Sequence, residues 1–177
     1  MGNCNKYDAS TARNEDLKAD QVKTELDEYM FFYHRFSAHR SALSVAAKQM
    51  VDAEERGVQL QKKFEVRSQD TKFLQEACAA MQEERRVLMW SYCQGYWLKR
   101  EGEKSAKEYS LFEHLQEQVE KYCDALSGLY ERPEDTLKDY HQFYAWKQEV
   151  INITNVCERQ LKNFIAGVGD GLTEERF

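Results

Sequence analysis

The chain has 177 residues, which is enough for one domain with a buried core. Charged residues make up 32% of it, and its net charge of -6 comes without a basic stripe, which argues against a nucleic-acid partner. The sequence shows neither a signal peptide nor an apolar run long enough to cross a bilayer. We therefore expect a cytoplasmic or nuclear protein without a membrane partner.

Residues 1–13 are polar and irregular, and the first predicted helix covers residues 14–67. Such a helix would be about 80 Å long at 1.5 Å per residue. The sequence therefore predicts either an elongated fold or a broken helix, with Gly57 as the candidate bend. The buried face is predicted from apolar residues spaced three and four apart: Leu26, Tyr29, Met30, Tyr33, Phe36, Leu43, Ala47, Met50 and Val51.

The second predicted helix runs from Ser68 or Asp70 to Lys99 and contains residues 87–98, which are apolar or aromatic all the way round. A helix of this kind lies in the middle of its domain. We therefore expect the structural core to include Trp90, Tyr92, Tyr96 and Trp97. Gly95 is predicted to let a neighbouring helix come close.

The third predicted helix begins at Ser110, which forms a capping box with Glu113, and ends before Pro133. The fourth begins near Asp135 or Thr136 and is followed by a flexible tail over residues 167–177. Its buried stripe is Phe143, Trp146, Val150, Ile153, Cys157, Leu161 and Phe164. The predicted fold is all-α, an elongated bundle of about four main helices.

The residues alone predict no catalytic or metal chemistry. His34 and His39 do not share a helix face, and the acids around Glu83 and Glu84 are typical of a solvated surface. The cysteines within predicted helices are expected to be reduced thiols: Cys78, Cys93, Cys123 and Cys157. On composition and pattern, the chain is a helical interaction module.

A series of short motifs, in order and at matching distances, covers nearly the whole chain. Residues 3–7 read NCNKY, residues 29–36 read YMFFYHRF with Ala38 and His39 after them, residues 86–92 read RVLMWSY, and residues 126–132 read LSGLYER. Together this series resembles the C-terminal Ariadne domain of the RING-between-RING ubiquitin ligases.

The resemblance implies a function and a division of the chain. Residues 1–13 would be the end of a preceding RING2 domain and a linker, with Cys4 as its last zinc ligand, and residues 14–166 would be the Ariadne helical domain. Family members pass ubiquitin from a conjugating enzyme to a RING2 cysteine, and the Ariadne domain folds over RING2 to inhibit transfer until a neddylated cullin–RING ligase releases it. The parent protein would then be a zinc-containing ubiquitin transferase, and this chain would have no ligase activity and no cofactor of its own.

The resemblance also points to three autoinhibitory positions. The family has an aromatic–acid pair at the positions of Val45 and Ala46, where this chain has neither the ring nor the carboxylate, and it has an acid at the position of Glu131. Without the resemblance, Glu131 is a helix-terminal acid beside Arg132. The alternative function is a free-standing cytosolic scaffold or adaptor that shares the pattern but has no link to ubiquitin.

Overall fold

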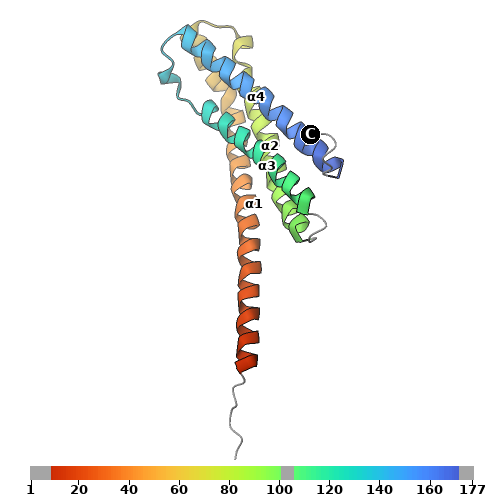
Figure 1. Ribbon diagram of the computed structural model, residues 1–177. Coiled ribbons are helices and arrows are strands. Elements are labelled where there is room, and N and C mark those ends of the chain that lie inside the picture. The colour runs from red at the N-terminus through yellow and green to blue at the C-terminus, as the bar shows by residue number, and fades with distance from the viewer. Residues whose placement is uncertain (1–8, 101–105, 172–177) are drawn as a thin grey trace, which may run out of the picture.

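The computed structural model describes residues 9–100 and 106–171, with side chains described from residue 17 onward (Figure 1). Within these ranges there are four long helices and no strand, which confirms the predicted all-α fold. The long helices are α1 (Ala9–Phe64), α2 (Phe73–Arg100), α3 (Ala106–Tyr130) and α4 (Tyr140–Gly169), with short 3₁₀ turns η1 (Ser68–Thr71) and η3 (Glu134–Thr136) between them. None of the described helices contains a stretch apolar enough to span a membrane.

Helix α1 is continuous over 56 residues, and it is about 84 Å long at 1.5 Å per residue. In Figure 1 its N-terminal part extends beyond α2 and α3, so the elongated alternative holds and the broken one does not. Gly57 does not interrupt the helix. A Cβ at this position would lie 3.2 Å from Oγ1 of Thr71, so the glycine lets η1 pack closely against α1.

The buried seam of α1 differs from the predicted face. Leu26, Tyr29, Tyr33 and Val51 are exposed. Apart from Gly57, the buried residues recur at every seventh position: Phe32, His39, Ala46, Ala53 and Leu60. A strict seven-residue repeat is the pattern of a helix that keeps one narrow seam against a partner. The small residues of this seam permit close contact with α2, and the large apolar residues beside it lie where no described helix covers them.

Helix α4 buries the stripe that was predicted for it, except for Ile153, which is half-buried. In α2 a stripe of apolar residues is also buried: Leu74, Cys78, Met81, Leu88 and Tyr92. Trp146 of α4 is fully buried, and its indole N–H donates to the carbonyl of Leu129 over 2.8 Å. Helices with neighbours on one broad side therefore show their core face in the 3–4 spacing.

Several helix starts differ from the predictions. α1 begins at Ala9 rather than at Asn14, and α3 begins at Ala106, so Ser110 lies inside the helix and does not cap it. Ala, Lys and Glu are strong helix formers, and residues 106–108 extend α3 by one turn. The predicted start of α4 at residues 135–136 is occupied by η3. The cap is Asp139, whose Oδ1 accepts from the Gln142 backbone N–H at 2.8 Å.

The central segment of α2 is not buried on all sides. Tyr92 lies in the core as predicted and Tyr96 is half-buried, but Trp90 is 58% exposed and Trp97 is 67% exposed. The prediction that both tryptophans belong to the core is therefore wrong. They are seven residues apart, and both lie on the exposed side of α2 next to α1, where Trp90 meets the Phe36 ring. Gly95 is buried and lets α3 pack closely against α2, as predicted, since a Cβ there would lie 3.0 Å from the Phe112 ring.

Candidate interdomain contact surface

Glu131 lies at the end of α3 with its side chain exposed to solvent. Its Oε1 accepts hydrogen bonds from Nε2 of Gln49 at 3.4 Å and from Oγ of Ser127 at 3.5 Å. Gln49 belongs to α1 and follows Val45 by one helical turn. The fold thus brings Glu131 beside the part of α1 that holds Val45, although the two lie far apart in sequence.

The two residues at the family's aromatic–acid positions face opposite ways. Val45 is 52% exposed, whereas Ala46 is 4% exposed and belongs to the seam between α1 and α2. The Ala46 carbonyl accepts a hydrogen bond from Nε2 of Gln82 on α2 at 3.2 Å. Ala46 therefore cannot contact a docked domain directly, and its inclusion among the contact residues is corrected. Val45 and Glu131 remain as a shared exposed surface.

Arg56 holds the backbone around Glu131 in place. Its guanidinium donates to the carbonyls of Tyr130 and Arg132, the second at 2.7 Å, and to the carboxylate of Glu134. It also lies 4.8 Å from the centroid of the Tyr130 ring. Since Glu131 stands between two carbonyls bound by one rigid donor group, its backbone is fixed before any partner arrives. Arg56 was not predicted as a site residue, although its position between the buried residues Ala53 and Leu60 indicates that its side chain lies close to the core.

A second exposed feature is an aromatic groove of about 280 Å³ between the N-terminal half of α1 and the C-terminal half of α2. It is lined by Tyr29, Phe32, Tyr33, Phe36, Tyr92, Cys93, Tyr96 and Trp97. The Phe36 ring meets the exposed Trp90 ring edge-on at 5.6 Å, which extends the apolar surface along α2. A contiguous exposed apolar patch of this kind is typical of a protein interaction site.

The Glu120 side chain of α3 links α1, α2 and α3 next to Tyr92, which lines this groove. Its carboxylate accepts from the Tyr92 hydroxyl at 2.9 Å and from Arg35 at 3.0 Å, and Nε2 of His39 lies 3.3 Å away. His39 first, and then Tyr92 and Arg35, lower the pKa of Glu120 to about 2, against the effect of burial. His39 is thus a buried, hydrogen-bonded residue. The arrangement is a polar cross-link between helices.

The structure corrects the prediction for Glu84. It is 0% exposed, and neither carboxylate oxygen has a hydrogen-bond partner within the described chain, so it does not belong to a solvated face. Glu83, its neighbour, is exposed and paired with Arg86 as expected. Burial raises the pKa of Glu84 to about 7, and the thiols of Cys157 and Cys123 oppose this rise.

The structure describes the four helical cysteines but not Cys4, the predicted zinc ligand. Cys78, Cys123 and Cys157 are buried free thiols and Cys93 is half-buried, and burial raises the pKa of all of them. No cluster of three or more His, Cys, Asp or Glu side chains suited to a metal occurs in residues 9–100 and 106–171. The predicted tail begins too early, because α4 continues to Gly169 and Gly167 is buried. Residues 3–7, with Cys4, and residues 172–177 lie outside the described residues, so the predictions for them stay open.

Comparison with known proteins gives one family. The sequence model of the Ariadne domain matches residues 27–173. Probable E3 ubiquitin-protein ligase rbrA of Dictyostelium discoideum is 47% identical over 170 residues, covering 96% of this chain and 32% of the relative. E3 ubiquitin-protein ligase ari-1.1 of Caenorhabditis elegans is 26% identical (97% and 33% covered), and ariadne-1 of Drosophila melanogaster is 23% identical (98% and 32% covered). The chain spans about a third of the length of these relatives.

Proposed function

Because the chain belongs to the Ariadne domain family, we propose that it is the regulatory domain of a RING-between-RING E3 ubiquitin ligase. The relatives are named as ubiquitin ligases, and the chain corresponds to about a third of each. In this proposal a RING2 domain of the same protein, which binds zinc, receives ubiquitin from a conjugating enzyme on its cysteine. The chain described here folds over RING2 and slows the onward transfer.

The observation that carries this proposal is the common surface formed by Glu131 and Val45. Arg56 fixes the backbone on both sides of Glu131, so only the exposed Glu131 side chain has to be ordered on docking. A contact of this kind loses little conformational entropy on docking, which favours a reversible clamp. The uncovered aromatic groove supports the same view, since it offers apolar area that a docked domain would remove from water.

The residues also set the strength of the proposed clamp. Val45 lacks the family's aromatic ring, and Ala46, being buried, offers no carboxylate to the surface. We therefore expect a weaker clamp and a higher basal activity than in members that keep both groups. A neddylated cullin–RING ligase would release what remains of the inhibition by competing for the domain or for RING2.

The free-standing scaffold is the second candidate. An exposed aromatic groove suits an adaptor as well as a regulatory domain, so the geometry alone does not separate them. The family match and the named relatives favour the ligase, and the parent gene would decide the question. Zinc-binding domains rich in Cys and His directly upstream would establish the ligase, and their absence would leave the scaffold.

The decisive experiment compares the full-length parent with its Glu131→Ala form in autoubiquitination without a cullin partner. Loss of one partner of a desolvated polar contact costs about 1–3 kcal/mol, which shifts a closed state by about fivefold to a hundredfold. We expect basal activity to rise within this range with an unchanged melting temperature. The matched control is Glu117→Ala, an exposed acid on α3 about 21 Å along the helix from Glu131. Unchanged basal activity in Glu131→Ala contradicts the clamp.

A further inference from the structure

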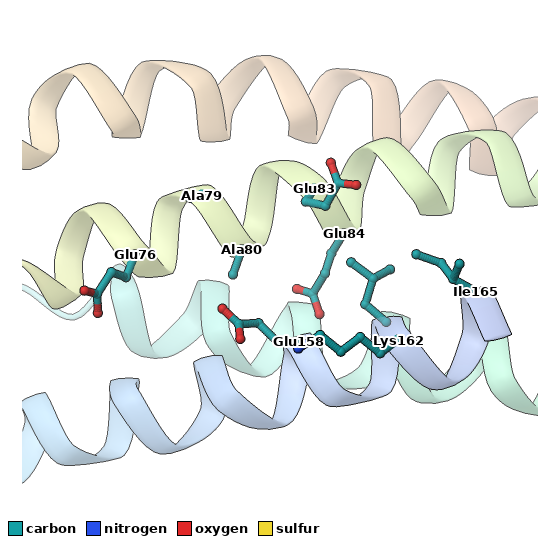
Figure 2. Close-up of a pocket in the computed structure, with 9 residues that line it drawn as sticks. Glu76, Ala79, Ala80, Glu83, Glu84, Glu158, Lys162 and Ile165 are labelled. Atoms are coloured by element: carbon teal, nitrogen blue, oxygen red, sulfur yellow. The ribbon is translucent and has the colours of Figure 1, made fainter.

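Glu84 is a fully buried carboxylate without a charged partner inside the described chain. Its residue exposure is 0%, and neither Oε1 nor Oε2 receives a hydrogen bond of good geometry, although the thiols of Cys123 and Cys157 lie against the carboxylate. A buried carboxylate in this condition is costly when it is ionised, so it either stays protonated or pairs with a cation. Figure 2 shows the side chain extending from α2 toward α4, where Glu158 and Lys162 are drawn. The unsatisfied group therefore points into the space between these two helices.

That space is a groove of about 420 Å³ between α2 and α4. Its apolar lining comes from Ala79 and Ala80 on α2 and from Leu161 and Ile165 on α4, and Ile165 is half exposed. Its charged lining comes from Glu76, Glu83, Glu84, Glu158 and Lys162. Glu83 is paired with Arg86, so two exposed acids, Glu76 and Glu158, and the buried Glu84 share the groove with one lysine.

The charged and titratable neighbours of Glu84 do not neutralise it. Arg85, the next residue on α2, donates to Asp124 of α3 at 2.7 Å and is thereby committed to another acid. From α3 and α4 the nearest titratable groups are the thiols of Cys123 and Cys157, which are weak donors. Lys162 lines the same groove without a hydrogen bond to either oxygen of Glu84. Glu84 thus has no cationic partner among the described residues.

We propose that the groove between α2 and α4 binds a lysine or arginine side chain of a partner protein, with Glu84 as its counter-charge. The alkyl stem of such a residue would pack on the apolar floor, and its cation would pair with the carboxylate, which is fully buried in the free chain and must become accessible on binding. Leucine or alanine residues flanking the basic residue would cover the half-exposed Ile165. The proposal is independent of Glu131 and of the ligase assignment, because it rests on a different pair of helices.

The proposal has a consequence for pH dependence. In the free protein the pKa of Glu84 is about 7, so its carboxylate is largely protonated at pH 6 and largely ionised at pH 8. A cation binds the ionised form, and binding releases the proton held by the neutral form. Affinity should therefore rise by about tenfold between pH 6 and pH 8, since the ionised fraction rises by that factor for a single group. A peptide held by exposed acids alone would show no such change.

The test uses the 177-residue chain and a dansyl-labelled pentapeptide, acetylated and amidated, with arginine at its centre and leucine and alanine on either side. Its matched control carries citrulline, which is neutral and nearly identical in shape. We expect saturable binding by fluorescence anisotropy, with amide shifts in α2 and α4, and at least tenfold weaker binding of the citrulline peptide. Glu84→Gln should weaken the arginine peptide by a similar factor, while Glu117→Gln should leave it unchanged.

Four results would overturn the proposal. They are equal affinity for the arginine and citrulline peptides, an unchanged affinity in Glu84→Gln, a flat pH profile, and no saturation up to about 1 mM peptide, which corresponds to less than about 4 kcal/mol. Displacement of the peptide by millimolar magnesium or calcium chloride, but not by sodium chloride at equal ionic strength, would instead assign the groove to a small divalent cation. If Glu84→Gln does not fold, the citrulline comparison and the pH profile of the unaltered chain still decide.

Discussion

Replacement of the buried Glu84 by glutamine should remove a pH-dependent loss of stability. The ordinary pKa of a glutamate is 4.5, and burial raises that of Glu84 to about 7. Below pH 4.5 the group is protonated in both the folded and the unfolded chain and does not disfavour folding. As the pH rises toward 7, the unfolded chain loses its proton first and is stabilised relative to the folded one. Above pH 7 the penalty is constant.

The size of this penalty follows from the two pKa values. A difference of about 2.5 units at 1.36 kcal/mol per unit gives about 3 kcal/mol at pH 8, a large part of a domain's stability. Glutamine has nearly the same shape and no titration. Any pH-independent effect of the glutamine amide on the free energy of unfolding drops out, because each protein is compared with itself at different pH values.

The assay is urea unfolding followed by circular dichroism at pH 4.5, 6, 7 and 8. Relative to Glu84→Gln, the unaltered chain should lose about 3 kcal/mol between pH 4.5 and pH 8, with most of the loss below pH 7. Other titrating groups cancel in the difference because both proteins share them. A difference between the two pH profiles below about 1 kcal/mol would refute the reasoning, because it would mean that Glu84 is hydrated or paired in solution.

Five further substitutions test other parts of the structure. Trp146→Ala should cost about 3–5 kcal/mol in urea unfolding and Trp90→Ala about 1 kcal/mol or less, and equal costs would contradict their opposite burial. Gly95→Ala should lower the melting temperature, because the added methyl group would lie 3.0 Å from a buried phenylalanine ring. This strain should exceed the gain of roughly 1 kcal/mol in helix propensity. A higher melting temperature would show that the ring moves aside. Glu120→Gln should cost about 3 kcal/mol at pH 7 and about nothing at pH 2, because the pKa of Glu120 is held near 2 and its contribution is lost as the pH falls from 4.5; an equal cost at both pH values would exclude the ionic contacts as the cause. Val45→Phe should lower the basal autoubiquitination of the full-length parent by restoring an exposed ring at the proposed clamp, and unchanged activity would exclude this position.

The fold could be predicted from sequence where a helix has broad cover. In α4 the stripe through Trp146 and Phe164 is visible in the 3–4 spacing because α2 and α3 cover that side. In α1 the same rule failed. The seam is narrow and made partly of small residues such as Ala46 and Ala53, while larger residues such as Tyr29 lie on the uncovered part of the helix. The prediction therefore chose the face with the largest apolar side chains and overlooked the seven-residue repeat of smaller residues that is in fact buried.

The site could be predicted only in part, because its key contacts join distant parts of the chain. The resemblance selected Glu131 and Val45, and the fold places both on one exposed surface. Arg56 and Glu84 were missed, since the partners of Arg56 lie 74 to 78 residues away and the burial of Glu84 depends on the packing of α4. Helical spacing reports the face of a single helix and carries no information on which helix covers it.

The most direct test of the regulatory role is the rate at which ubiquitin leaves the RING2 domain of the parent. RING2 would be charged with ubiquitin, and its discharge to free lysine would be followed with and without the 177-residue chain added in trans. We predict that the added chain slows ubiquitin discharge and that its Glu131→Ala form slows it less. The Glu117→Ala form should slow discharge as much as the unaltered chain does. Identical discharge rates with and without the unaltered chain would contradict the regulatory role.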